Sequence, residues 1–173
     1  MYAALLLIPF LLIRFVFLYV LDKDSLKRAA FFAPMLNGSE ITYYIYQLSN
    51  IIIFIYLFFL KIKTIPLFFF YIGIGVYMAG IILLAISVVN FAAPSESGVN
   101  ESGIYRISRN PMYVAYFICF VGFALLTQSL ILLGFVLIFQ ISAHRIILAE
   151  EKWCIEKFGE EYLQYMNSVG RYI

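Results

Sequence analysis

Two polar segments interrupt the apolar second half of this chain, and their residue types suit the binding of a charged ligand. The first reads GIYRISRNPMY over residues 103–113, and the second starts at Glu150 and Glu151 and continues to Tyr162. Guanidinium, amide, phenol and carboxyl groups are concentrated there. Because such groups are costly beside membrane segments, a cluster of them indicates a functional site.

The first segment suits an anion or a planar ring. Pro111 favours the first turn of a helix, whose free N–H groups can donate to a carboxylate or a phosphate. Tyr105 and Tyr113 can stack on a planar ring. A basic loop that only contacts lipid headgroups accounts for the same residues, so both interpretations stay open here.

The second segment follows a helical pattern in which Gln140, His144 and Glu151 share one face. His144 is the only histidine, and packing or a hydrogen bond is favoured over catalysis. One histidine without paired carboxylates offers too few ligands for a metal, so no metal site is expected.

The elements that position these residues are predicted from composition. With 64% hydrophobic and 13% charged residues, the chain is expected to be an all-α integral membrane protein with one domain, residues 1–173. The net charge of +2 does not suggest nucleic acid as a partner. Five apolar segments predict about five transmembrane helices: Tyr2–Leu21, Ile41–Leu60, Ile65–Phe91, Met112–Thr127 and Leu130–Ala149.

Two of these segments have distinctive ends. The first is too long for the apolar region of a signal peptide and is expected to be retained. The fourth is short for a span of about 20 residues. Only Thr127, Gln128 and Ser129 separate it from the fifth, which predicts a tight helical hairpin.

Loop charges predict the orientation. With five spans, nine lysines and arginines fall on one side of the membrane and two, Lys61 and Lys63, on the other. Positive loops favour the cytoplasm, so the N-terminus is expected outside and both polar segments inside.

Three smaller features also lead to expectations. Arg14 lies inside the first span, as a headgroup site or as a side chain that snorkels to the interface. Gly75 and Ala79 predict close helix packing. The apolar positions between Trp153 and Met166 predict an amphipathic terminal helix on the cytoplasmic face, where it could cap a pocket.

The polar residues resemble a known signature. Ser102-Gly103-Ile104-Tyr105 followed by RNPMY over residues 109–113 is similar to the Arg-His-Pro-x-Tyr motif of the isoprenylcysteine carboxyl methyltransferase and phospholipid methyltransferase superfamily. The second half of the signature is matched by Glu150-Glu151, Phe158-Gly159, Tyr162, Tyr165, Val169 and Arg171. The resemblance covers about residues 88–173 and is of the compact bacterial type.

This resemblance implies an S-adenosylmethionine-dependent membrane methyltransferase with a lipophilic small-molecule or lipid acceptor. It implies a bacterial or archaeal inner membrane and an active site facing the cytoplasm. The residues that it assigns to the cofactor are Ser97, Gly98, Val99, Asn100, Tyr105, Asn110, Pro111, Met112, Tyr113 and Glu150. Arg109 and Arg145 are assigned to the acceptor, and Asn90 is a weaker candidate. No catalytic residue is assigned, because in-line methyl displacement needs alignment rather than a protein nucleophile.

Departures from the signature leave the acceptor open. Asn110 replaces the usual histidine and cannot act as an acid or base near neutral pH. Eukaryotic prenylcysteine enzymes carry an arginine where this chain has Ile146, with Arg145 one position away. A phospholipid amine or a small thiol therefore remains an alternative acceptor.

Two further classes are weighed against the methyltransferase. Sterol reductases share the C-terminal architecture and bind a nicotinamide cofactor, but they carry an acidic residue where this chain has Tyr116. A non-catalytic membrane scaffold would not require both polar segments.

Overall fold

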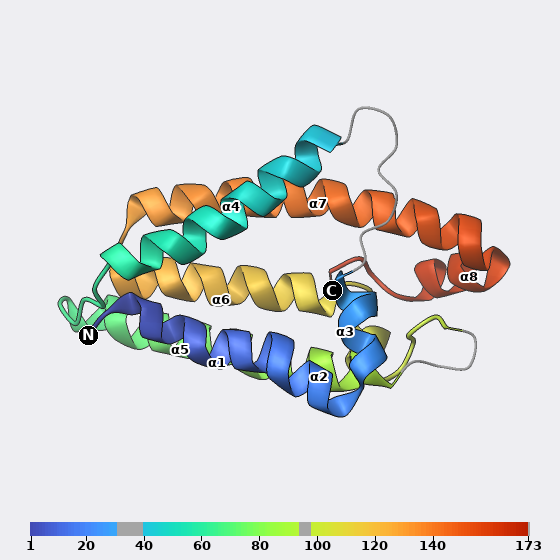
Figure 1. Cartoon of the computed structure of the whole chain (residues 1–173), viewed down its shortest axis with the longest axis horizontal. Helices are drawn as coiled ribbons and strands as arrows, with labels where there is room; N and C mark the ends of the chain where they lie inside the picture. Colours follow the sequence, from blue (N-terminus) through green and yellow to red (C-terminus); the bar gives the residue numbers. More distant parts are fainter. Residues whose placement is uncertain (31–39, 94–97, 173) are drawn as a thin grey trace.

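The computed structural model describes residues 1–30, 40–93 and 98–172, and within these ranges the chain is built from helices (Figure 1). The first span, Ala3–Leu21, combines η1 (Ala3–Leu6), α1 (Leu7–Leu11), the π-helical η2 (Leu12–Phe17) and α2 (Leu18–Leu21). The remaining elements are α3 (Lys23–Ala30), α4 (Glu40–Phe59), α5 (Leu67–Ala92), η3 (Gly103–Arg106), α6 (Pro111–Thr127), α7 (Leu130–Phe158) and α8 (Glu160–Ser168).

The expected all-α membrane architecture is confirmed. Within the described residues, four helices are long and apolar enough to cross a membrane: the first span, α4, α5 and α7. The fourth predicted segment forms α6, which has 17 residues and is shorter than these four. Its length of about 25 Å, at 1.5 Å per residue, still carries it between the two ends of the bundle.

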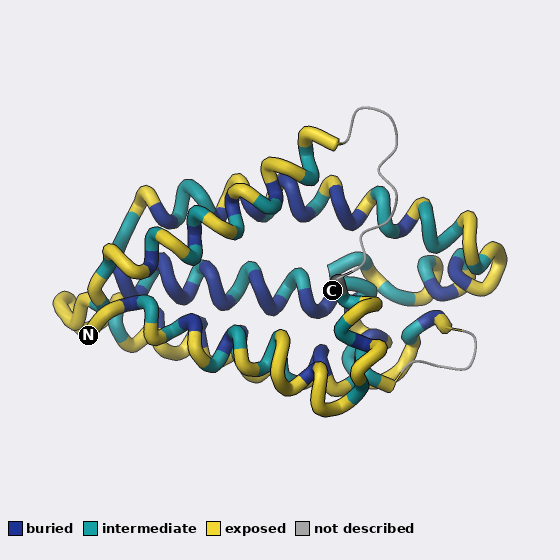
Figure 2. Tube along the Cα trace, viewed as in Figure 1, coloured by how far each residue is buried: buried dark blue, intermediate teal, exposed yellow. Residues whose placement is uncertain are grey.

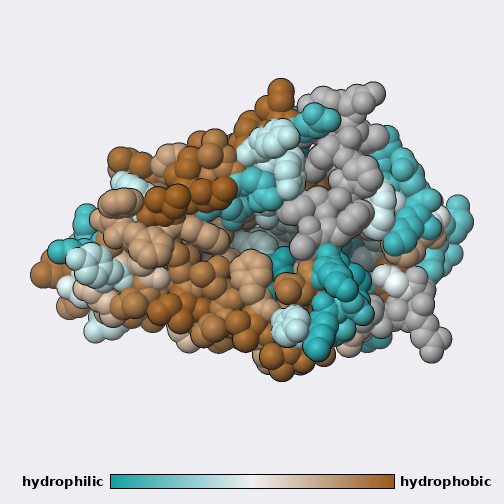
Figure 3. Space-filling model, in the orientation of Figure 1, coloured by the Kyte–Doolittle hydropathy of each residue, from teal (hydrophilic) through white to brown (hydrophobic). Residues whose placement is uncertain are grey.

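Helix α6 is the core of the bundle rather than a lipid-facing helix. Phe120 and Phe123 are fully buried, and Figure 2 shows α6 as the most continuously buried helix. Its neighbours instead expose apolar side chains, which form the brown surface in Figure 3. This arrangement lets lipid contact the outer helices, while α6 has no exposed residue and packs mainly against protein.

Small residues bring α5 and α6 together, though not the pair predicted from sequence. A Cβ atom at Gly80 would lie 2.7 Å from the backbone nitrogen of Cys119, and one at Gly122 would lie 2.8 Å from Cα of Tyr77. Gly75, by contrast, is exposed and has no heavy atom within 4 Å of such a Cβ position. The expectation that Gly75 packs within the bundle is therefore wrong, because the helical turn directs it away from α6.

The tight hairpin between the last two long helices is confirmed. Gln128 adopts a left-handed conformation with φ 49°, and the Ser129 side chain accepts a hydrogen bond from the Leu132 amide at 3.2 Å. The same turn is held to the α4–α5 connection, because the Lys63 amide donates to the Leu126 carbonyl at 2.9 Å. The hairpin and Lys63 therefore lie together at one end of the molecule.

The opposite end gathers α3, η3, α8 and the C-terminal residues (Figure 1). Helix α7 reaches this end without interruption through Phe158, and at about 44 Å it exceeds a hydrocarbon core of about 30 Å. The sequence predicts the amphipathic terminal helix from the apolar positions between Trp153 and Met166. The structure corrects its start, because the chain turns only at Gly159 and α8 begins at Glu160.

Candidate active site

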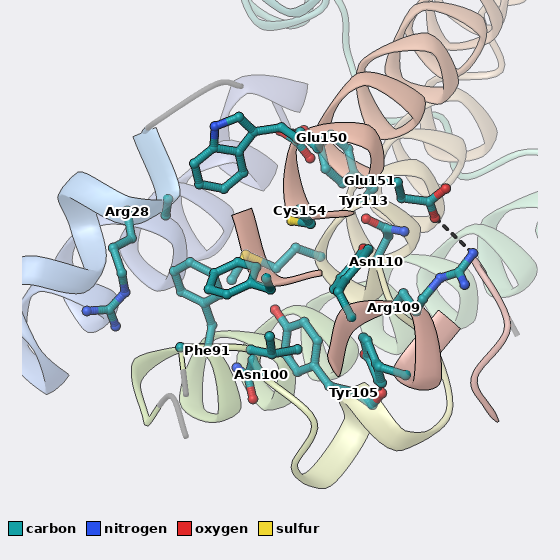
Figure 4. Close-up of a pocket in the computed structure, with 18 of the residues that line it drawn as sticks. Arg28, Phe91, Asn100, Tyr105, Arg109, Asn110, Tyr113, Glu150, Glu151 and Cys154 are labelled. Atoms are coloured by element: carbon teal, nitrogen blue, oxygen red, sulfur yellow. Dashed lines mark hydrogen bonds and ion pairs between the residues drawn. The ribbon is translucent and has the colours of Figure 1, made fainter. Parts of the chain in front are cut away.

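A cavity of about 280 Å³ lies at the end formed by α3, η3 and α8 (Figure 4). Both polar sequence segments contribute to its wall. The residues that line it are Arg14, Arg28, Ala29, Tyr46, Phe91, Gly98, Val99, Asn100, Tyr105, Arg109, Asn110, Met112, Tyr113, Tyr116, Glu150, Glu151, Trp153, Cys154, Phe158, Tyr162 and Tyr165. Its size is close to the lower end of the range of about 300–1,000 Å³ that is typical of ligand sites.

A buried ion-pair cluster joins the two segments at the wall of the cavity. The Arg109 guanidinium lies 2.9 Å from the Glu151 carboxylate, and their side chains are only 7% and 5% exposed (Figure 4). Arg171 donates to both oxygens of the same carboxylate at 2.8–3.0 Å. We call these three residues the Glu151 cluster. The hydrogen bond from Arg171 to Glu151 raises the pKa of Arg171, so its charge is permanent.

The cluster also holds the C-terminal residues against the loop before α6. Arg109 donates from its side chain to the Met166 carbonyl at 2.9 Å and from its backbone to the Gly170 carbonyl at 3.0 Å. The Asn110 side chain donates to the Arg171 carbonyl at 3.2 Å. The loop and the end of the chain therefore form one polar unit.

A second link between the segments lies beside the cavity. The Tyr113 hydroxyl donates to the Glu150 carboxyl at 3.0 Å, and this is the one hydrogen bond to Glu150 among the described residues. The Tyr113 ring also packs edge-on to Tyr46 and Tyr116, with centroids 6.3 and 6.2 Å apart. One wall of the cavity is thus aromatic and carries a single carboxyl group.

Asn90 shapes the loop that closes the cavity. Its side-chain oxygen accepts from the Ile104 amide at 2.8 Å, and its backbone carbonyl accepts from the Asn100 side chain at 2.8 Å. Gly103 must remain glycine, because its φ is +56° and a Cβ would lie 2.1 Å from the Asn90 oxygen. Asn90 therefore has a structural role, and it does not line the cavity.

The terminal helix α8 packs against the loop that contains Val99 and Tyr105. Tyr162 and Tyr165 of α8 pack with Val99 in a small apolar cluster. The Tyr165 hydroxyl donates to the Tyr105 carbonyl at 2.7 Å. Burial raises the pKa of Tyr105 and of Tyr165, so both phenols stay protonated near neutral pH.

Comparison with known proteins assigns this arrangement to a family. The profile of the phospholipid methyltransferase family matches residues 62–161, which is more than half of the chain. The chain belongs to the phospholipid methyltransferase family. Tyr113 and Glu150, which form the hydrogen bond beside the cavity, both lie within the matched region.

A curated relative points to the same superfamily. The chain is 36% identical over 86 residues to "Protein-S-isoprenylcysteine O-methyltransferase" of Saccharomyces cerevisiae. The aligned region covers 48% of this chain and 35% of the yeast protein. No solved structure matches the chain. The resemblance inferred from the motifs is thus confirmed at the level of the superfamily.

Most residues that the resemblance assigned to the cofactor meet at the cavity of this family member. Those that line it are Gly98, Val99, Asn100, Tyr105, Asn110, Met112, Tyr113 and Glu150. Pro111 begins α6 but is not among the lining residues, and Ser97 lies outside the described residues.

The two arginines assigned to the acceptor lie in different places. Arg109 lines the cavity, but its guanidinium is held in the Glu151 cluster. Arg145 is exposed on α7 and does not line the cavity, because the neighbouring Ile146 and Ile147 occupy the inward face. Asn110 contacts the Arg171 carbonyl, which an amide can do at any pH.

Sequence reasoning assigned no cofactor or acceptor role to several lining residues. Arg14 was visible as a charge within an apolar span, but Tyr46 and Tyr116 gave no signal among the many tyrosines. The prediction of a hydrogen bond for His144 is confirmed, since its Nδ1 lies 2.6 Å from the Tyr172 hydroxyl. No group of three metal-binding side chains is present in the described part of the chain.

Proposed function

We propose that this protein is an S-adenosylmethionine-dependent methyltransferase that acts on a lipophilic, membrane-associated acceptor, with its active site facing the cytoplasm. One observation carries the proposal. The two polar segments, which are distant in sequence, form one cavity wall through the Tyr113–Glu150 hydrogen bond and the Arg109–Glu151 ion pair. Membership of the family and the likeness to the yeast enzyme support it.

The groups around the cavity suit this cofactor. S-adenosylmethionine carries an adenine ring, an ammonium, a carboxylate and a sulfonium. Glu150 can accept a hydrogen bond from an ammonium or a ribose hydroxyl, and it receives only Tyr113 from the described residues. The Nε of Arg109 is buried and has no hydrogen-bond partner among those residues, although the rest of its guanidinium is held by Glu151. Aromatic faces such as Tyr105 and Tyr113 suit both an adenine ring and a sulfonium cation.

The chemistry places few demands on the protein. When bound, the cofactor supplies an electrophilic methyl group for an in-line displacement. The residues of this chain hold the reactants in line and exclude water. Tyr162 and Tyr165 of α8 line the cavity and pack with Val99, so they can help to exclude water.

No base is required for a carboxylate or a thiolate acceptor. The protonated Tyr105 and Tyr165 cannot remove a proton near neutral pH, and the Asn110 amide is neither an acid nor a base there. An amine acceptor would have to arrive deprotonated. Because this proposal assigns Glu150 to the cofactor, an acceptor that is already nucleophilic suits the site.

Binding to the purified full chain in detergent tests the proposal. Isothermal titration calorimetry should detect binding of S-adenosylhomocysteine, the demethylated product of the cofactor. It should detect no binding of NADPH. Binding of NADPH without any response to S-adenosylhomocysteine would favour a reductase and overturn the proposal.

A further inference from the structure

The first span carries a single charged residue, and that residue reaches the cavity. Arg14 is the only lysine, arginine, histidine, aspartate or glutamate between Ala3 and Leu21. It lies in η2, a π-helical segment of six residues within an otherwise apolar span. Such wide turns often occur at functional sites, because the extra residue in the turn redirects a side chain. Arg14 lines the cavity from this position.

The guanidinium of Arg14 is anchored at one end and open at the other. Its Nη2 donates to the Ala29 carbonyl of α3 at 2.8 Å. The group lies over the Tyr116 ring, 5.8 Å from the centroid. Its Nη1 is buried and has no hydrogen-bond partner among the described residues. The side chain is thus held in place while one donor stays unused.

Arg14 differs from the other two arginines that line the cavity. Arg109 is paired with Glu151 at 2.9 Å, and Arg28 is paired with Asp22 at 3.2 Å. No carboxylate of the described residues lies within 4.0 Å of the Arg14 guanidinium. Glu150 lines the same cavity, but its carboxyl group accepts a hydrogen bond from Tyr113 and not from Arg14. Among the described residues, Arg14 therefore brings to the cavity a positive charge that no carboxylate pairs with.

Its depth makes this charge costly without a ligand. Arg14 lies seven residues before the end of the span at Leu21, which corresponds to about 10 Å along a helix. A charge within the bilayer is normally paired, or faces a cavity with a function. An anion that binds at Nη1 would supply the missing partner.

We propose that Arg14 binds the anionic head group of the methyl acceptor. The acceptor class is then an amphiphile that carries a carboxylate or a phosphate beside an apolar chain. The inference rests on the proposed methyl transfer and adds the acceptor's charge to it. Arg14 lies outside residues 62–161, so the family match does not include it.

The surroundings of Arg14 also suit the apolar part of such a molecule. Tyr46 of α4 and Arg14 of η2 line the same cavity from two helices. The main contacts of α4 with the first span are made by η1, at the far end, and the two helices separate toward the cavity (Figure 1). Exposed apolar residues such as Phe15 and Leu48 flank this region on the two helices. An acyl or prenyl chain can therefore remain in contact with lipid while the head group reaches Arg14.

Trp153 provides a direct probe, because it is the only tryptophan and it lines the cavity. The full chain is held in detergent with S-adenosylhomocysteine, and ligands are titrated into it while tryptophan fluorescence is recorded. Two pairs of ligands are used, each made of an acid and its uncharged counterpart. The carboxylate pair is N-acetyl-S-farnesyl-cysteine and its carboxamide. The phosphate pair is dihexanoyl phosphatidic acid and dihexanoylglycerol. One acid should bind at least about tenfold more tightly than its neutral twin, and the pair that does so identifies the head group.

Variants test whether this preference for the acid over its neutral counterpart depends on Arg14. R14Q should abolish it while S-adenosylhomocysteine still binds, and R14K should retain part of it. R106Q makes the same change at an exposed arginine outside this cavity and should preserve it. The inference is overturned if wild type does not prefer either acid, a result that needs no variant to fold. It is also overturned if folded R14Q keeps the preference or loses S-adenosylhomocysteine binding. Failure of wild type to bind S-adenosylhomocysteine would instead remove the proposed function, and the inference with it.

Discussion

Glu150 stands out among the carboxyl groups near the cavity because its protein partners leave it free to bind a ligand. Its carboxyl group accepts a hydrogen bond from the Tyr113 hydroxyl at 3.0 Å, and it takes part in no ion pair among the described residues. The adjacent Glu151 is fully engaged by two arginines. The two neighbouring glutamates thus differ in their partners: Glu151 is held by two arginines, whereas Glu150 retains acceptor capacity toward the cavity.

Glu150→Ala should weaken the binding of S-adenosylhomocysteine by about ten- to a hundredfold, the effect of losing a charged hydrogen-bond partner. Calorimetry on the detergent-solubilised protein measures this. Glu156→Ala is the matched control, because Glu156 is exposed on the same helix and does not line the cavity. Equal affinities for wild type and Glu150→Ala would contradict the cofactor role of Glu150.

Glu151→Ala should instead destabilise the fold by about 3–5 kcal/mol, because it leaves Arg109 buried without its counter-ion. Thermal unfolding in detergent measures the change. Asp24→Ala breaks the Asp24–Lys27 pair, whose side chains are 72% and 83% exposed, and should change the unfolding temperature little. Similar effects for the two variants would mean that the Glu151 cluster does not hold the C-terminal residues in place.

At the scale of elements, the close contact between α5 and α6 positions the start of α6 at the cavity. The contact depends on glycines that face the partner helix at backbone distance, such as Gly80 against Cys119. Backbone atoms cannot move aside as a flexible side chain can. The helix spacing is therefore sensitive to a single added methyl group.

Gly80→Ala should lower stability by about 1–3 kcal/mol through overpacking. Gly75→Ala and Gly134→Ala add the same methyl group where no heavy atom lies within 4 Å, and alanine favours a helix over glycine. These two variants should be neutral or slightly stabilising. Thermal unfolding of the three proteins side by side checks the order, and a destabilising Gly75→Ala would indicate a contact outside this chain.

At the scale of the whole molecule, charge and cavity lie at the same end. Lys61 and Lys63 lie at the hairpin end. Most of the other basic side chains lie near the opposite end, in α3 (Lys23, Lys27, Arg28), in and after η3 (Arg106, Arg109), at the end of α7 (Lys152, Lys157) and at Arg171. Arg145 is an exception, since it precedes Lys152 and Lys157 in α7 and lies closer to the hairpin. The positive-inside rule therefore predicts a cytoplasmic cavity.

Cysteine labelling tests this orientation. In a Cys154→Ser background, where Cys119 is buried, Ser102→Cys and Ser168→Cys should react with an impermeant maleimide only in inside-out vesicles. Lys63→Cys, exposed at the other end, should react in intact cells. Reaction of all three positions from the same side would contradict the topology.

The sequence alone determined the membrane class, the approximate spans, the hairpin and the superfamily. These depend on local properties: apolar run length, turn residues and motif spacing. Most of the predicted cofactor residues also line the cavity, because motif residues adjacent in sequence stay adjacent in space.

Only the tertiary structure decided which polar groups are free to bind a ligand. Arg109 and Arg145 look equivalent as charges in sequence, yet one is held by Glu151 and the other is exposed on α7. Arg14 and Tyr46 reach the cavity from helices distant in sequence. Which face of each helix turns inward depends on packing against the others, and that information is absent from any one segment.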